Sequence, residues 1–133
     1  VRSMTLEQQE HILYVEGKHN SNWISMLPMG LSNTFEVQVV TTVAEARDIL
    51  LQLSEGKRKF RAIILGGNID GPKKPMDSPE NDSQRILEQM RDLEISIPTI
   101  GFSGDPDPMP GVTRNFGKKD VNIFELQTYI NSL

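Results

Sequence analysis

The stretch Phe60-Arg61-Ala62-Ile63-Ile64-Leu65 is the part of the chain on which the fold assignment depends. Such an apolar run, bounded by Gly66-Gly67-Asn68, is typical of a strand that is covered on both faces, as strands in the middle of parallel sheets are. We therefore predict a buried central strand over 60–65. Glycine follows this strand, and glycine offers neither a nucleophile nor a metal ligand.

Further apolar segments of strand length lie on both sides of this run and alternate with segments of helical period. This order is expected of a parallel sheet that is covered by helices on both faces. The predicted strands are residues 11–15, 36–40, 60–65, 97–102 and 113–116.

The clearest helix is predicted over 43–54, where apolar residues recur at helical spacing. Thr42 and Glu45 have the spacing of a capping box at its start. Gly56 stands where a left-handed residue would end the helix.

Three other helices are less regular. One is indicated by cap candidates at 81–83, and a last one begins after Asp120. A short helix is also expected over 22–27, and Pro28 and Gly30 leave the position of its end open.

Two insertions follow strands of the predicted sheet. Residues 70–79 contain three prolines, and residues 104–111 have proline at every other position from 106 to 110. Because proline removes backbone donors and disfavours helix, both segments are expected to be irregular. The fourth and fifth strands would then be joined without a helix.

Size and composition match one globular domain. The chain has 133 residues, of which 37% are hydrophobic and 24% charged, with a net charge of −4 and no cysteine. We interpret residues 1–7 as a tail and 8–133 as a single domain. The acidic balance argues against direct nucleic-acid binding, no apolar stretch predicts a membrane anchor, and a cytoplasmic location is expected.

The ends of the predicted strands resemble those of the receiver (CheY-like) domains of two-component response regulators, over nearly the whole chain. The matching segments are 12–17, 61–68, 97–104 and 111–119. The resemblance implies a flavodoxin-like, three-layer α/β sandwich with a parallel five-stranded sheet in the order 2-1-3-4-5. Here the usual helix between strands 4 and 5 would be missing.

The family's chemistry is retained only in part. In active members an acidic pair and an aspartate bind Mg²⁺, the aspartate is phosphorylated, and a hydroxyl and a lysine engage the phosphate. By resemblance, Glu16, Ser103 and Lys118 match one acid, the hydroxyl and the lysine. The departures are Gly17 for the second acid, Gly66 for the aspartate, Lys119 for a proline and Asn115 for an aromatic residue.

These gaps predict a pseudo-receiver with a degenerate phosphorylation pocket, formed by Glu16, Gly17, Gly66, Asn68, Ser103, Lys118 and Lys119. Neither catalytic residues, a metal site nor a cofactor is expected. Its partner would be a protein, such as a kinase, an effector domain or a second copy of the chain.

Other interpretations stay open. Lys118 and Glu16 can form a purely structural ion pair, and Asp70 is an alternative phosphoacceptor four residues after Gly66. A different class of function is a small-molecule domain that binds an anion or nucleotide in the cleft of Gly66, Ser103 and Lys118.

Overall fold

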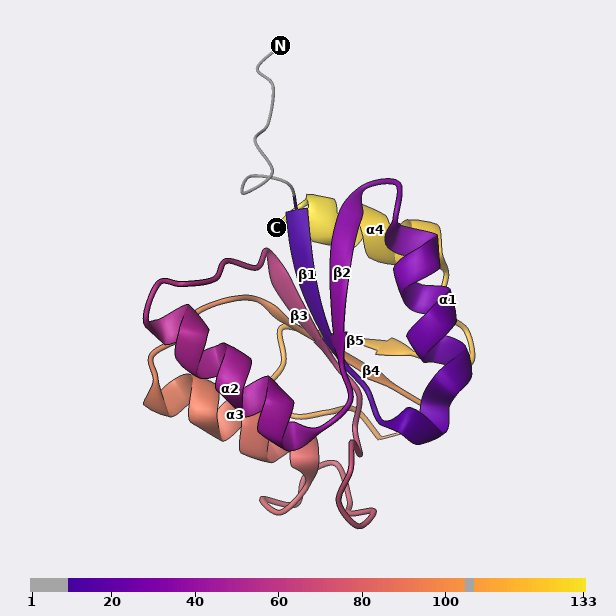
Figure 1. The fold of residues 1–133 in the computed structure, drawn as a ribbon. Helices are drawn as coiled ribbons and strands as arrows, with labels where there is room; N and C mark the ends of the chain where they lie inside the picture. The colour runs from indigo at the N-terminus through magenta and orange to yellow at the C-terminus, as the bar shows by residue number, and fades with distance from the viewer. Residues whose placement is uncertain (1–9, 105–106) are drawn as a thin grey trace.

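A computed structural model describes residues 10–104 and 107–133, so the predicted tail and positions 105–106 of the second insertion lie outside the described residues. The described residues form a five-stranded sheet in the order β2-β1-β3-β4-β5 (Figure 1). All four pairings are parallel, which confirms the predicted topology. The strands are β1 (Glu10–Val15), β2 (Phe35–Val40), β3 (Ala62–Leu65), β4 (Thr99–Ser103) and β5 (Arg114–Gly117).

Helices cover both faces of the sheet and make a three-layer α/β/α sandwich. Figure 1 shows α2 and α3 on one face and α1 and α4 on the other. The helices are α1 (Ser21–Leu31), preceded by the 3-10 turn η1 (Lys18–Asn20), α2 (Val43–Ser54), α3 (Asp82–Asp92) and α4 (Ile123–Asn131). The described residues between β4 and β5 contain no helix, as predicted. No helix in the described part of the chain has the length and apolar character needed to cross a bilayer.

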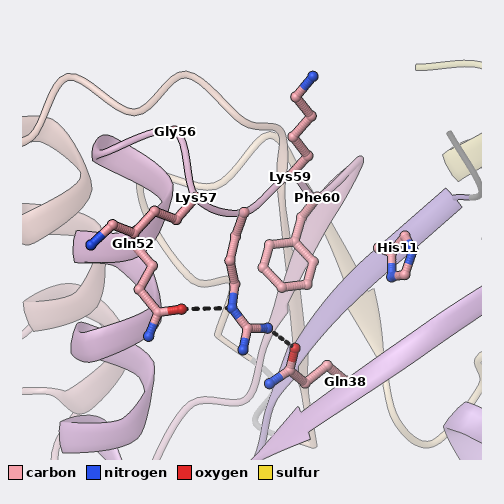
Figure 2. Close-up of a pocket in the computed structure, with 8 residues that line it drawn as sticks. His11, Gln38, Gln52, Gly56, Lys57, Lys59 and Phe60 are labelled. Carbon is pink, nitrogen blue, oxygen red and sulfur yellow. Dashed lines mark hydrogen bonds between the residues drawn. The ribbon is translucent and has the colours of Figure 1, made fainter. Parts of the chain in front are cut away.

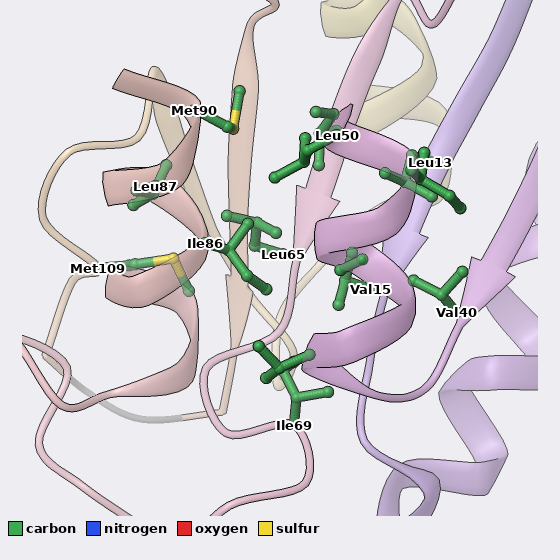
Figure 3. Packing of buried hydrophobic residues seen from close by; sticks show 14 of the residues in the cluster. Leu13, Val15, Val40, Leu50, Leu65, Ile69, Ile86, Leu87, Met90 and Met109 are labelled. Atoms are coloured by element: carbon green, nitrogen blue, oxygen red, sulfur yellow. The ribbon is translucent and has the colours of Figure 1, made fainter. Parts of the chain in front are cut away.

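The core consists of two layers because alternate side chains of each strand point to opposite faces. Leu13, Val15 and Leu65 pack under α2 and α3, as Figure 3 shows. Ile12 and Ile64 belong to the cluster on the other face of the sheet. Burial on both faces explains why residues 62–65 are apolar without alternation.

The helix ends follow the sequence signals. The Thr42 hydroxyl accepts a hydrogen bond from the Glu45 backbone N–H at 3.1 Å, which caps α2. Gly56 follows α2 with a positive φ of 75°, the left-handed conformation that glycine adopts without strain. Asn81 caps α3 by accepting from the Ser83 N–H at 3.0 Å.

Three predicted strands began too early, β5 by one residue, since it starts at Arg114 rather than at 113. β3 starts at Ala62 rather than at 60, and β4 starts at Thr99 rather than at 97. Before β3, the Arg61 side chain is directed to the C-terminus of α4, where it donates to the Ile130 and Asn131 carbonyls, each at 2.9 Å. The Arg61 backbone N–H still donates to the His11 carbonyl of β1 at 2.8 Å, so pairing with β1 continues one residue before β3 begins.

The helix predicted over 22–27 is longer than expected and continues through Pro28 to Leu31. Leu27 and Leu31 are completely buried, so packing on the sheet compensates for the hydrogen bond that proline cannot donate. Gly30 lies against α4, because a Cβ there would be 2.9 Å from Ile123 Cγ2. The residue that suggested a helix end instead allows two helices to approach.

Candidate functional site

The carboxyl edge of the sheet contains a buried carboxylate with three polar partners. Glu16, directly after β1, has 0% exposure. Its Oε1 lies 2.5 Å from Lys118 Nζ and accepts a hydrogen bond from the Tyr14 hydroxyl at 2.7 Å. Asn20 Nδ2 donates to Oε2 at 3.4 Å. The predicted ion pair between Lys118 and Glu16 is therefore confirmed.

Gly66 leaves the space that the Glu16 carboxylate fills. A Cβ added to Gly66 would lie 2.1 Å from Glu16 Oε2 and 3.2 Å from the Val15 carbonyl oxygen. Contacts under 3.0 Å require something to move. The acid at the end of β1 thus occupies the volume that a side chain at the end of β3 would need.

Gly17 is similarly enclosed. An added Cβ would lie 2.4 Å from both His19 Cε1 and the Ile69 carbonyl oxygen. A second acid beside Glu16 would therefore require a different backbone path.

The residues present do not fit the magnesium site of the receiver family. Mg²⁺ is usually held by one or two carboxylates together with waters and phosphate oxygens. Glu16 is the one carboxylate that the resemblance assigned to that site, and its charge is already paired with the Lys118 ammonium group. In the described ranges, no group of three or more His, Cys, Asp or Glu side chains is arranged to hold a metal ion.

A cavity of about 560 Å³ opens beside this ion pair. Its lining residues are His19, Asn20, Gly67, Asn68, Gly71, Lys73, Met76, Ser103, Gly104 and Lys118. Met76, from the insertion after β3, is only 4% exposed and covers Gly67, where an added Cβ would lie 2.1 Å from its Cε. The insertion predicted as an irregular loop thus supplies one wall of the cavity.

Of the other predicted site residues, some line this cavity and some do not. Asn68 and Ser103 line it, and the Asn68 side chain also accepts from the Lys74 N–H at 3.0 Å. Lys119 is exposed and does not line it. Asp70 is exposed and accepts from the Val43 N–H at 3.4 Å, at the start of α2 rather than in the cavity.

Asp82 is an organising residue that the sequence interpretation treated only as a cap candidate. It is 3% exposed, and its Oδ2 accepts from the N–H groups of Ile69, Asp70 and Gly71 at 2.8, 3.2 and 3.1 Å. Three charge-assisted bonds to successive amides hold the backbone that leaves β3. An acidic residue at the start of a helix is common, and nothing in the local sequence indicates that Asp82 would bind the backbone N–H groups at the end of the preceding strand.

Asn115, which the resemblance placed where the family has an aromatic residue, holds part of the connection between β4 and β5. Its side chain donates to the Met109 carbonyl at 3.1 Å and accepts from the Met109 N–H at 3.0 Å. Met109 is 2% exposed, so this pair anchors the connection between β4 and β5. The sequence analysis noted only the missing aromatic ring at this position and did not predict these contacts.

The Tyr14 hydroxyl keeps its proton in the folded protein. Burial, and then the negative charge of Glu16, raises the pKa of Tyr14 far above its usual value. The hydroxyl therefore remains a donor to Glu16, and Lys118 is not the only group that stabilises the carboxylate.

Comparison with known proteins identifies the fold. The chain matches no family profile and no curated protein sequence. It is similar in structure to a two-component response regulator from Clostridium difficile, with a TM-score of 0.69, 14% identity, and coverage of 93% of this chain and 94% of that one. The phosphorylated cyanobacterial phytochrome response regulator RcpA aligns with a TM-score of 0.66 and 22% identity over 93% and 90% of the two chains.

A third similar structure is the signal receiver domain of an HD domain-containing protein from Pseudomonas fluorescens. The TM-score is 0.65 with 19% identity, and 93% of each chain is covered. The chain therefore has the fold of response-regulator receiver domains, the CheY-like arrangement, which confirms the predicted fold class. At these identities the likeness concerns the fold.

Proposed function

We propose that this chain is a pseudo-receiver, a signalling domain that acts through protein contacts without being phosphorylated at the end of β3. The observation that carries the proposal is the position of the Glu16 carboxylate, 2.1 Å from where a Cβ on Gly66 would lie. Position 66 offers no nucleophile, and a paired carboxylate fills the space in which one would act.

The remaining acids near the site are poor acceptors for different reasons. Glu16 is completely buried, so a phosphodonor cannot reach it from solvent. Asp70 is accessible, but it lies outside the lining of the cavity that contains Lys118. A phosphoryl group on Asp70 would lack the lysine that stabilises the transferred charge.

A non-enzymatic domain of this kind needs a macromolecular partner. We propose a kinase, an effector domain or a second copy of the chain, in the cytoplasm. One similar structure is the receiver domain of an HD domain-containing protein, which is an example of this fold joined to another domain. The connection between β4 and β5, anchored through Asn115, would present a different surface from that of a receiver with a helix there.

Incubation with acetyl phosphate and Mg²⁺, followed by intact-mass measurement, tests the proposal. We expect no phosphoryl adduct, while an active receiver domain treated in parallel becomes phosphorylated. A stable adduct that disappears in Asp70→Ala or in Glu16→Gln would defeat the phosphorylation-independent function.

The second candidate is a domain that binds an anion or nucleotide in the same cavity. It is favoured by Lys73, which lines the cavity and has no ion pair within the described ranges. Lys118 and Ser103 add polar groups on the other side, although Lys118 is already engaged by Glu16.

Thermal-shift screening with phosphate, nucleotides and other anionic metabolites distinguishes the two functions. A ligand at 100 times its Kd adds about 2.7 kcal/mol of stability, which gives a clear shift. Anion binding predicts a shift that is reduced in Lys73→Ala and kept in Lys18→Ala. The absence of a shift with every anion would count against this candidate.

A further inference from the structure

A second hollow lies toward the amino ends of the strands, away from the Glu16 cavity. It has a volume of about 640 Å³ and is bounded by β1, β2, the last turn of α2 and the segment 56–60. Figure 2 shows the Phe60 ring and the Gln38 side chain facing it, with His11 on β1 on the far side.

The hollow is locally basic in a chain whose net charge is −4. Lys57, Arg58 and Lys59 follow one another and all line it. Lys57 has an exposed partner in Glu55, at 3.6 Å. Lys59 has no ion pair among the residues that the structure describes.

Arg58 is held in place by neutral groups. Its Nε donates to Gln52 Oε1 at 2.7 Å, and its Nη1 donates to Gln38 Oε1 (Figure 2). Two amide oxygens fix the plane of the guanidinium without neutralising its charge. A guanidinium has five N–H donors, so donors remain for an incoming carboxylate.

A groove of about 460 Å³, lined by both apolar and polar side chains, adjoins the basic hollow. The two share Arg58, Lys59 and Phe60. Its other apolar lining residues are Leu53, Leu93, Ile95 and Ile97, which are partly exposed and pack on the core under α2 and α3. Ser54, Glu94 and Ser96 line it as well, so one acidic side chain lies among them. Cationic and apolar groups thus lie side by side on one surface, which we call the amino-edge surface.

We propose that the amino-edge surface binds a segment of a partner protein in which acidic residues flank a bulky apolar side chain. The apolar side chain occupies the groove, and the carboxylates pair with Arg58 and Lys59. The combination favours a peptide over a nucleic acid, because three consecutive cations are a small basic area, and because the apolar side chains of the groove have no role in contacting phosphates. This site lies away from the Glu16 cavity and does not depend on whether that cavity is phosphorylated.

Fluorescence anisotropy with the full chain and a labelled peptide, Asp-Glu-Leu-Phe-Glu-Asp, tests the proposal. We expect saturable binding that weakens as salt is raised, since exposed ion pairs are screened. Replacing Leu-Phe by Ser-Ser removes the apolar contacts, and replacing the four acids by Ser removes the ion pairs. Each change is expected to weaken binding by about tenfold or more.

Charge-reversal variants supply the matched control. Lys59→Glu is expected to weaken binding by about tenfold, whereas Lys18→Glu, the same change at an exposed lysine of η1, leaves it within about twofold. Arg58→Lys keeps the charge but loses the planar donor arrangement and is expected to weaken binding as well. Amide shifts in ¹⁵N-labelled protein should be confined to residues 52–60 and 93–97.

Four results would overturn the proposal. One is the absence of saturable binding at millimolar peptide. Another is equal binding of the Leu-Phe and Ser-Ser peptides, and the third is equal weakening by Lys59→Glu and Lys18→Glu. Binding of an oligothymidylate as tight as that of the peptide would also overturn it, in favour of a general polyanion surface.

Discussion

Replacing Lys118 by methionine is the most informative single perturbation of the Glu16 cavity. Lys118 Nζ lies 2.5 Å from a carboxylate that is completely buried, and the lysine side chain itself is 12% exposed. Methionine keeps much of the apolar stem of lysine and removes the charge. The variant therefore leaves Glu16 buried with only the Tyr14 hydroxyl and a long contact from Asn20.

The expected loss in the free energy of unfolding is large. Removing one partner of a buried ion pair costs about 3–5 kcal/mol, because the other charge stays buried without compensation. The Tyr14 hydrogen bond remains and should keep the loss near the lower end, about 3 kcal/mol. Typical domains have only 5–15 kcal/mol of stability, so the effect is readily measured.

Urea unfolding followed by Trp23 fluorescence measures this loss. Trp23 packs against Phe102 at 4.9 Å between ring centroids and should report loss of the core. Lys119→Met is the control, since Lys119 is exposed and its replacement should change stability by about 0.5 kcal/mol or less. The double variant Glu16→Gln with Lys118→Met should be more stable than Lys118→Met alone, because no buried charge is left without a partner.

A loss in Lys118→Met of under about 1 kcal/mol, equal to that in Lys119→Met, would refute the reasoning. It would mean that the carboxylate finds water or another partner. The cavity would then be open to ligands and cations, contrary to the proposed pseudo-receiver.

Three further predictions concern the same region. Gly66→Ala should destabilise by about 1–3 kcal/mol because its Cβ meets a carboxylate oxygen at 2.1 Å, whereas Gly104→Ala, with nothing within 4 Å, should be close to neutral in urea unfolding. Asp82→Ala removes the acceptor of three backbone N–H groups and should cost about 3 kcal/mol and speed tryptic cleavage of the 70–79 loop, while the exposed Asp77→Ala should do neither. The folded state raises the pKa of Tyr14 above its usual value of about 10, so the unfolded chain releases this proton first as the pH rises. The free energy of unfolding should therefore be unchanged by this group below about pH 10 and should fall at higher pH. Unfolding measured as a function of pH should show a less steep fall in Tyr14→Phe.

Local pattern was sufficient for the architecture. The helix over 43–54 was predicted with its observed bounds, since its apolar period, the Thr42 cap and Gly56 all act within a few residues of the chain. The strand order also followed, because the resemblance at strand ends and the alternation of elements left one topology. The predicted strand starts at 60 and 97 were wrong. An apolar pattern does not show that the Arg61 side chain contacts the end of α4, or that Pro98, which has no N–H, precedes the first residue of β4.

The sequence predicted which residues belong to the candidate site but not how their side chains are arranged. Glu16 and Lys118 are distant in sequence, and only parallel packing of the strands brings their ends together. Asp70 and Lys119, placed in or near the site by position alone, lie outside the cavity lining, whereas Met76 and Lys73 enter it from a loop without regular structure.

The amino-acid order thus determined which residues are apolar, where helices begin and that position 66 has no side chain. Those properties are local, because they depend on side-chain type and on neighbours a few residues away. That the missing side chain's volume is filled by the Glu16 carboxylate, and that the carboxylate is neutralised by Lys118, required the fold. Steric volume and charge pairing depend on distances between residues far apart in the chain, and those distances exist only after the sheet has formed.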